Sequence, residues 1–349
     1  MKILEINNVK IGTGYKPYFI AELSANHGGS INNAKNLIKL AKRSGANAVK
    51  IQSYSPETMT IRCDKDDFQI KEGLWMGKNL YELYEEAQTP FEWHKDLYDY
   101  AQKIGLTIFS TPFDETAVDL LEKLNTPAYK IASFELTDLD LIEYVAKKNK
   151  PIFISTGMAS IEEISLAIES CKKKNNEKIL LFHCISSYPA ELKDSHLYNI
   201  SYLSKEFNTL VGLSDHTTDN YASIIAVSLG ASAIEKHFKI NNKDSGPDSD
   251  FSIVPEEFKQ LVAQCNLAHT AIGNSSFKRS ESESLNRRFR RSLYFVKDLK
   301  KGHFIAKDDF KKIRPGFGLN PKYSKDIIGK KLKTDVEFGD PVAWNAFEY

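Results

Sequence analysis

Two histidines follow neighbouring apolar runs in the second half of the chain. His216 comes after the run 209–213, and His237 comes after the run 232–235. The segment between them, 219–229, has the pattern of an amphipathic helix, so the three pieces read as a strand–helix–strand unit. Because the carboxyl ends of parallel strands meet at one edge of a sheet, the two imidazoles should lie close together. Such a pair suits a borderline divalent cation, although most histidines at strand ends only satisfy hydrogen bonds.

Two lysines lie inside other apolar runs. Lys50 and Lys130 each have apolar neighbours on both sides in the sequence. Lysine is rarely buried without a partner, so an anion should face each of them. That anion is either a carboxylate, such as Glu22 or Glu135, or a bound ligand. The same two carboxylates are also candidates for general acid–base catalysis.

Hydroxyl and other polar side chains follow most of the apolar runs. Ser155 and Ser214 precede helical segments and offer hydroxyl and backbone N–H groups to a phosphate, although such residues are also ordinary helix caps. Further polar residues at the ends of runs are Gln52, Thr111, Ser133, Ser186 and Tyr188. Together with two buried lysines, this arrangement indicates a phosphate-bearing ligand beside a two-histidine metal site.

The elements that must position these residues alternate regularly. Strands are expected at 18–23, 47–52, 106–110, 128–132, 151–155, 178–184, 209–213 and 232–235, with helices at 31–43, 90–103, 114–124, 137–148, 159–173, 219–229 and 255–272. Eight strands alternating with helices over residues 1–272 predict a (β/α)₈ TIM barrel, whose catalytic groups lie at the carboxyl ends of the strands. A doubly wound open sheet is the alternative. The even strand number and the lack of a GxGxxG motif after the first strand disfavour it.

Three stretches depart from this repeat. The connection 53–89 is far longer than the usual loop of about two to six residues. It carries aromatic residues such as Trp75, so a packed lid or a dimer contact is expected. Residues 273–289 are polar and predict a linker. Residues 290–349 alternate short β-like pieces with glycine turns and predict a small β-rich domain.

Composition narrows the class of protein. The chain has 349 residues, 42% hydrophobic and 27% charged, enough for a large core. Its four cysteines show no metal or disulfide spacing, as expected in a reducing cytoplasm. Neither a signal peptide nor a run of membrane-spanning length is expected, so no membrane partner is predicted. The basic carboxyl-terminal region has no recognition helix, which argues against nucleic acid.

Seven motifs, in order along the chain, resemble the sialic acid synthase family. They are FIAELSANHGG (19–29), AVKIQ (48–52), FSTPFD (109–114), YKIASFE (129–135), ISTGMAS (154–160), GLSDHT (212–217) and IEKHF (234–238). The stretches 290–302 and 313–319 are similar to the antifreeze-like (SAF) domain of that family. Within the family, the segment 74–94 is similar to the pseudaminic acid branch.

The resemblance implies a phosphoenolpyruvate-condensing enzyme that uses Mn²⁺ or Mg²⁺. In that family the enol carbon attacks the aldehyde of an open-chain amino sugar, water adds to the second enol carbon, and phosphate leaves with C–O cleavage. The branch implies a 2,4-diacetamido-2,4,6-trideoxyhexose as the sugar. N-acetylmannosamine or the legionaminate precursor are alternatives. A non-catalytic sugar- or ice-binding protein is the alternative from another class, and buried lysines disfavour it.

The family's residue roles transfer to matching positions of this sequence. The resemblance implies metal ligation by His216 and His237. The positions that match phosphoenolpyruvate contacts are Lys50, Lys130, Ser133, Ser155 and Ser214, with Thr111 beside them. Glu135 matches a group that handles protons on the attacking water or the departing phosphate. Glu22 matches one that contacts either the sugar side or a metal-bound water.

Two further positions concern the sugar and a second subunit. Asp248 matches a contact to a sugar hydroxyl. Ser186 stands near a position where the neuraminate branch has an asparagine. Arg314 matches an arginine that reaches the active site of the other subunit, so the resemblance implies a domain-swapped homodimer.

Overall fold

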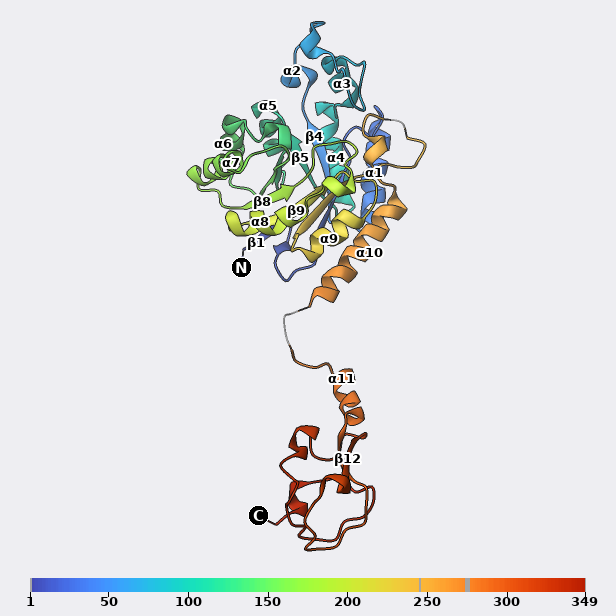
Figure 1. The fold of residues 1–349 in the computed structure, drawn as a ribbon. Helices are drawn as coiled ribbons and strands as arrows, with labels where there is room; N and C mark the ends of the chain where they lie inside the picture. Colours follow the sequence, from blue (N-terminus) through green and yellow to red (C-terminus); the bar gives the residue numbers. More distant parts are fainter. Residues whose placement is uncertain (1, 245, 274–276, 349) are drawn as a thin grey trace. The chain divides into compact units, whose positions relative to one another are not determined.

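The computed structural model describes residues 2–244, 246–273 and 277–348. The chain divides into two compact units, of which the first ends at Gly273 and the second comprises the remainder. Figure 1 shows strands surrounded by helices in the first unit and a small, mostly non-helical second unit.

Eight parallel strands of the first unit close into a barrel in the order β10–β3–β4–β5–β6–β7–β8–β9. They are β3 (Tyr18–Glu22), β4 (Ala48–Ser53), β5 (Thr107–Pro112), β6 (Tyr129–Ile131), β7 (Ile152–Ser155), β8 (Ile179–His183), β9 (Leu210–Asp215) and β10 (Ala233–His237). The last strand pairs with the first, from Ala233 opposite Tyr18 to His237 opposite Glu22. The predicted (β/α)₈ barrel is confirmed, and the open sheet is excluded.

Helices cover the outside of the barrel (Figure 1). They are α1 (Ile31–Arg43), α4 (Phe91–Lys103), α5 (Glu115–Lys123), α6 (Leu139–Ala146), α7 (Ile161–Lys173), α8 (Tyr198–Glu206), α9 (Tyr221–Ser228) and α10 (Pro255–Ile272). The sequence did not predict α8. Its pattern is weak because Tyr198 and Tyr202 are exposed, and only Ile200 and Leu203 are buried.

A hairpin closes the end of the barrel at which the strands begin. The sequence analysis did not predict this hairpin. Strands β1 (Ile3–Ile6) and β2 (Val9–Gly12) pair antiparallel, and Asn7 and Asn8 between them both have positive φ, as a tight hairpin turn requires. Ile6 and Ile11 pack with apolar residues inside the barrel. The hairpin therefore plugs the end of the barrel opposite to the strand ends that carry chemistry.

Alternation along the strands places the chemistry above this apolar plug. Successive side chains of a strand point to opposite faces, so the inward face of β10 carries Ala233, then Glu235, then His237. Ala233 belongs to the apolar cluster inside the barrel together with Tyr18 and Phe109. On β3, β4, β6 and β10, the charged residues Glu22, Lys50, Lys130 and Glu235 thus follow apolar residues of this cluster, one layer further towards the carboxyl ends of the strands.

The long connection after β4 is structured. It contains α2 (Pro56–Met59) and α3 (Leu80–Ala87), which lie together beyond the end of β4 in Figure 1. Asn79 caps α3, because its Oδ1 accepts from Tyr81 N at 2.9 Å while its Nδ2 donates to the Cys63 carbonyl at 2.8 Å.

The second unit has its own core. Strands β11 (Ser292–Phe295) and β12 (Phe310–Ile313) pair antiparallel, and the core residues include Leu293, Phe295 and Leu332. The predicted linker, 273–289, is partly helical, since α11 covers Glu281–Leu285. Residues 274–276 of that stretch lie outside the described part of the chain. In the described residues, no helix is long and apolar enough to cross a membrane.

Candidate active site

A cavity of about 410 Å³ lies at the carboxyl ends of the barrel strands. Most of the residues that the sequence singled out line it together. These are Lys50, Gln52, Lys130, Ser133, Glu135, Ser155, Tyr188, Ser214, His216, His237 and Asp248. The two lysines and the two histidines therefore share one cavity rather than facing separate parts of the barrel.

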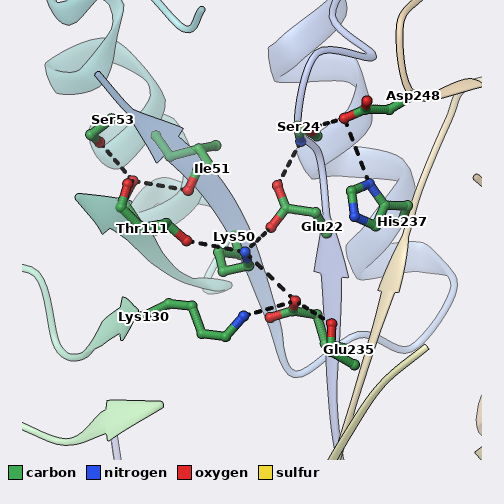
Figure 2. A network of polar contacts seen from close by, with 12 residues as sticks. Glu22, Ser24, Lys50, Ile51, Ser53, Thr111, Lys130, Glu235, His237 and Asp248 are labelled. Atoms are coloured by element: carbon green, nitrogen blue, oxygen red, sulfur yellow. Dashed lines mark hydrogen bonds and ion pairs between the residues drawn. The ribbon is translucent and has the colours of Figure 1, made fainter. Parts of the chain in front are cut away.

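The two lysines meet at a carboxylate that the sequence analysis missed. The Nζ of Lys130 lies 3.3 Å from Glu235 Oε1, and the Nζ of Lys50 lies 3.6 Å from the same oxygen. Ser214 Oγ donates to that oxygen at 3.0 Å. Lys50 also pairs with Glu22 and donates to Thr111 Oγ1 at 3.1 Å. Figure 2 shows this network converging on Lys50 and Glu235.

The sequence left open whether Glu22, Glu135 or a bound ligand faces each lysine. Lys50 contacts Glu22, one of these candidates, but Lys130 pairs with Glu235, which was not among them. A sequence signal for Glu235 existed. It lies two residues before His237, so the two-residue period of a strand puts both side chains on the inward face.

Burial and charge act in opposite directions on this cluster. Burial disfavours the charge on Lys50, but Glu22 and Glu235 outweigh it and raise the pKa of the lysine. For Lys130, burial dominates and lowers the pKa, although Glu235 opposes it. Burial also works against the charge on Glu235, yet the two lysines hold its pKa below the usual range. Glu22 behaves differently, because burial outweighs Lys50 and raises its pKa.

The two histidines form a second group in the cavity. Their ring centroids are 5.4 Å apart. His216 Nδ1 lies 2.8 Å from the Ile185 carbonyl, which can only accept, so Nδ1 carries the proton. Nε2 then keeps its lone pair and lies 3.5 Å from Ser214 Oγ. His237 Nδ1 is buried, lies 3.9 Å from Asp248 Oδ2 and has no hydrogen-bond partner among the described residues.

Both imidazoles are held in the form that can bind a metal. Burial lowers the pKa of His216 to about 4 and lowers that of His237 well below its usual value. Neutral imidazole is the ligating form. The Nδ1–H of His216 donates to a backbone carbonyl. A metal-ligating histidine commonly makes such a hydrogen bond through the nitrogen that does not bind the metal.

The donor set fits a cation that takes only two ligands from the protein. Within residues 2–244, 246–273 and 277–348, no three His, Cys, Asp or Glu side chains form a group that could hold a metal. Two nitrogens can serve as metal ligands: His216 Nε2, whose lone pair lies 3.5 Å from Ser214 Oγ, and His237 Nδ1, which has no hydrogen-bond partner among the described residues. Water and substrate oxygens would have to complete the coordination.

Glu135 stands at the edge of the cavity on the turn that follows β6. Its Oε2 is buried and has no hydrogen-bond partner in the described part of the chain. Burial raises the pKa of this carboxyl to about 7. A carboxyl that titrates near neutral pH can both take up and release a proton during catalysis.

A glycine allows two hydroxyl side chains to approach the loop after β7. A Cβ added at Gly157 would come 2.2 Å from Ser186 Oγ and 2.9 Å from Ser133 Oγ. Ser133 Oγ also lies 3.1 Å from Cys184 Sγ. The backbone at position 157 therefore packs directly against side chains that lie at the cavity wall.

Four predicted site residues do not line the cavity. Glu22 and Thr111 lie behind the lining and contact Lys50. Ser186 packs beside Gly157, and its buried Oγ has no hydrogen-bond partner among the described residues. Arg314 is exposed on the second unit, and its expected reach into another subunit stays a prediction.

The last two strands also carry an ion pair outside the barrel lumen. Lys236 Nζ lies 2.9 Å from Asp215 Oδ2 and donates to the carbonyls of Thr217 and Asp219, both at 2.6 Å. Lys236 and Asp215 alternate with the inward residues of their strands and are fully buried. This pair fixes the loop that follows β9, and with it the backbone of His216.

Comparison with known proteins identifies the family of the chain. The NeuB family model matches residues 37–277, and the SAF domain model matches residues 290–348. The chain belongs to the NeuB family. This confirms the resemblance seen in the motifs.

The NeuB-family relatives match over almost the full chain. A pseudaminic acid synthase from Campylobacter jejuni is 43% identical over 344 residues, 99% of this chain and 100% of the relative. An N,N'-diacetyllegionaminic acid synthase from Legionella pneumophila is 35% identical over 351 residues, 99% of this chain and 98% of the relative. The crystal structure of an N-acetylneuraminic acid synthetase from Leptospira borgpetersenii has a TM-score of 0.74 at 29% identity, covering 82% of this chain and 95% of that one.

Proposed function

We propose that this chain is a pseudaminic acid synthase, a transferase that condenses phosphoenolpyruvate with 2,4-diacetamido-2,4,6-trideoxy-L-altrose and releases phosphate. The observation that carries the proposal is one cavity containing two buried lysines and two neutral histidines. The choice of sugar rests on the 43% identity to a pseudaminic acid synthase, against 35% to a legionaminic acid synthase.

Phosphoenolpyruvate binds to the lysine side of the cavity. Lys50 and Lys130 supply positive charge where burial makes electrostatic attraction strong. The hydroxyls that would accompany them are those of Ser133, Ser155 and Ser214, with Thr111 holding Lys50 from behind. Glu235 is the internal counterion of both lysines in the absence of substrate.

His216 and His237 would hold a divalent cation, Mn²⁺ or Mg²⁺. When bound, it would polarise the aldehyde oxygen of the sugar. Phe251 packs edge-on against both imidazoles, with centroids 4.7 Å from His237 and 6.2 Å from His216. This packing keeps both rings in a fixed orientation towards the cavity.

The proton transfers fall to Glu135. The enol carbon attacks the aldehyde, water adds to the second enol carbon, and the C–O bond to phosphate breaks. Glu135, with a pKa raised by burial to about 7, takes the proton of the attacking water or gives one to the departing phosphate. Glu22 contributes on the sugar side. Its Oε1 accepts from Ser24 N at 2.7 Å, and Ser24 Oγ contacts Asp248 (Figure 2).

The sugar lies between Asp248 and the barrel mouth. Gln52, Tyr188 and Asp248 line the cavity and bind sugar oxygens, with Ser186 close to the same wall. The Tyr188 ring lies 4.6 Å from that of His216, and Asp248 Oδ2 lies 3.9 Å from His237 Nδ1. Arg314 of the partner subunit completes the site in a domain-swapped homodimer. The exposure of Arg314 on a basic second unit supports this arrangement.

The proposed substrate indicates the cellular compartment in which the enzyme acts. Because phosphoenolpyruvate is a cytoplasmic metabolite, we place the enzyme in the cytoplasm. All four cysteines are free, as a reducing compartment requires.

A panel of sugars tests the proposal. The purified chain should convert phosphoenolpyruvate and the trideoxyaltrose to pseudaminic acid, identified by mass and chromatography, and a chelator should abolish turnover. Faster conversion of N-acetylmannosamine or of the legionaminate precursor would replace the proposed substrate. Sugar binding with no turnover in the presence of metal would favour a non-catalytic binding protein.

A further inference from the structure

The cavity has two chemically different walls. The strand ends supply the charged and hydroxyl side chains described above. Among the described residues, the segment 53–89 contributes only apolar and aromatic side chains to the lining. We call part of this wall the apolar roof, formed by Met59, Ile70, Leu80, Leu83, Tyr84 and Ala87. None of the roles assigned above uses the apolar roof.

Helix α3 presents one complete face to the cavity. Its four lining residues, Leu80, Leu83, Tyr84 and Ala87, are spaced three and four residues apart and so lie on one side of the helix. Glu82 is exposed on the other side. The apolar face of an amphipathic helix normally packs against protein, whereas here it borders the space beside the lysines and histidines. Leu83 is already buried, whereas Leu80, Tyr84 and Ala87 are partly exposed and would be covered further by a bound ligand.

The apolar roof is held in place over the site. Trp75 Nε1 donates to the Pro247 carbonyl at 2.9 Å, next to Asp248, and the Trp75 ring lies 5.9 Å from that of Tyr188. Tyr84 of the roof packs edge-on against Tyr54, another lining residue, at 5.8 Å. The wall is therefore fixed to the loops that carry the proposed sugar contacts.

The reaction fixes which end of the sugar meets this wall. The aldehyde carbon has to reach the enol near the lysines and histidines. The other end of an open six-carbon chain lies five bonds away, and the apolar roof is the part of the lining that the aldehyde and the enol do not use. Against apolar side chains a methyl group is favoured, whereas a hydroxyl group loses its hydrogen bonds to water without replacement.

We propose that the apolar roof selects 6-deoxy acetamido sugars by packing against the C6 methyl and the acetamido methyl groups. This inference rests on the proposed function, because it requires the aldehyde end to lie at His216 and His237. The apolar roof accepts stereoisomers that share the C6 methyl, including the legionaminate precursor. It disfavours N-acetylmannosamine, which carries a hydroxyl at C6. A pocket of this kind discriminates by roughly 10²-fold.

Two sugars that differ by one oxygen test the roof: the trideoxyaltrose and its counterpart with a C6 hydroxyl. The variants are Leu83→Asn and Leu80→Thr, and Glu82→Gln on the outward face of α3 is the control. Leu80 is only partly buried, so its variant should fold even if Leu83→Asn does not. Melting curves of all variants establish folding.

The wild type should prefer the 6-deoxy sugar in kcat/KM by about 10²-fold. In Leu80→Thr and Leu83→Asn this ratio of kcat/KM values should fall at least about tenfold. The fall should come from a change in the KM of the sugar, and the KM of phosphoenolpyruvate should stay unchanged. The control should keep the wild-type ratio.

Two results would overturn the inference: a wild-type ratio near one, or folded variants that lose both sugars equally. If neither sugar is turned over, the proposed function fails separately. In that case, the affinities of the two sugars for the metal-loaded enzyme, measured by calorimetry, test whether the apolar roof discriminates between them. Equal affinities in the wild type, or an affinity ratio unchanged in Leu80→Thr, would refute it.

Discussion

Replacing Glu235 with glutamine removes the shared counterion of the two buried lysines while keeping the side-chain volume. Glu235 Oε1 lies 3.3 Å from Lys130 Nζ and 3.6 Å from Lys50 Nζ, and each of these side chains is at most 5% exposed. Breaking a buried ion pair from one side costs about 3–5 kcal/mol. For a unit of this size the melting temperature should fall by roughly 6–10 °C.

The assay is thermal unfolding with and without inorganic phosphate. In the variant, phosphate should replace the missing negative charge, so it should raise the melting temperature more than in the wild type. The matched control is Glu143→Gln, which removes a half-exposed pair with Lys174 at 2.8 Å and should leave the midpoint almost unchanged. An unchanged midpoint in Glu235→Gln, or equal stabilisation of variant and wild type by phosphate, would refute the reasoning.

Three further perturbations follow from the site. The pKa of Glu135 is raised to about 7, so the rate should change with pH around that value. Glu135→Gln should remove this inflection and lower kcat by about 10²–10⁴-fold. If the variant retained the inflection, the inflection would belong to another group. Gly157→Ala places a Cβ 2.2 Å from Ser186 Oγ. The variant should lose about 1–3 kcal/mol of unfolding free energy and show a higher KM for phosphoenolpyruvate. Wild-type stability together with a wild-type KM would contradict the close packing at position 157. His237→Ala should lose metal-dependent turnover and weaken Mn²⁺ binding in a calorimetric titration, whereas unchanged Mn²⁺ affinity would remove His237 from the metal site.

Much of the barrel could be predicted because its signals are local. Strand and helix periods alternate with short connections, so the order of elements and most of their bounds follow from the sequence. The errors have physical causes. Three strands run two residues further than predicted, to Pro112, Asp215 and His237, because their last residues are polar or proline and resemble a loop. Helix α8 was missed because exposed tyrosines mask its apolar face.

The site was predictable only in part. Polar residues at strand ends identified the cavity lining, including Lys50, Lys130 and both histidines. The counterion Glu235 was missed because it lies between apolar and basic neighbours inside a strand, and only strict alternation reveals that it points inward. Which carboxylate pairs with Lys130 depends on the closure of the barrel, which brings β10 opposite β6 across the lumen. No local pattern contains that information.

The residue spacing of the apolar roof is present in the sequence, but its role could not be inferred from the sequence. Leu80, Leu83, Tyr84 and Ala87 have the spacing of an amphipathic helix, and the long connection was expected to form a packed lid or a dimer contact. The structure shows that this face lines the cavity. The sequence could not distinguish a face packed on protein from one that borders a ligand site, because both need the same apolar stripe.

The central claim is that one cavity brings an enol phosphate and an aldehyde together, and phosphate release tests it most directly. With metal present, the wild type should release phosphate only when both phosphoenolpyruvate and the amino sugar are supplied, in equal amounts with the 2-keto acid. Lys130→Met should reduce this release by about 10–10²-fold in kcat/KM, the effect of losing one charged hydrogen bond. Phosphate release that does not depend on the sugar, or full activity in Lys130→Met, would contradict the account.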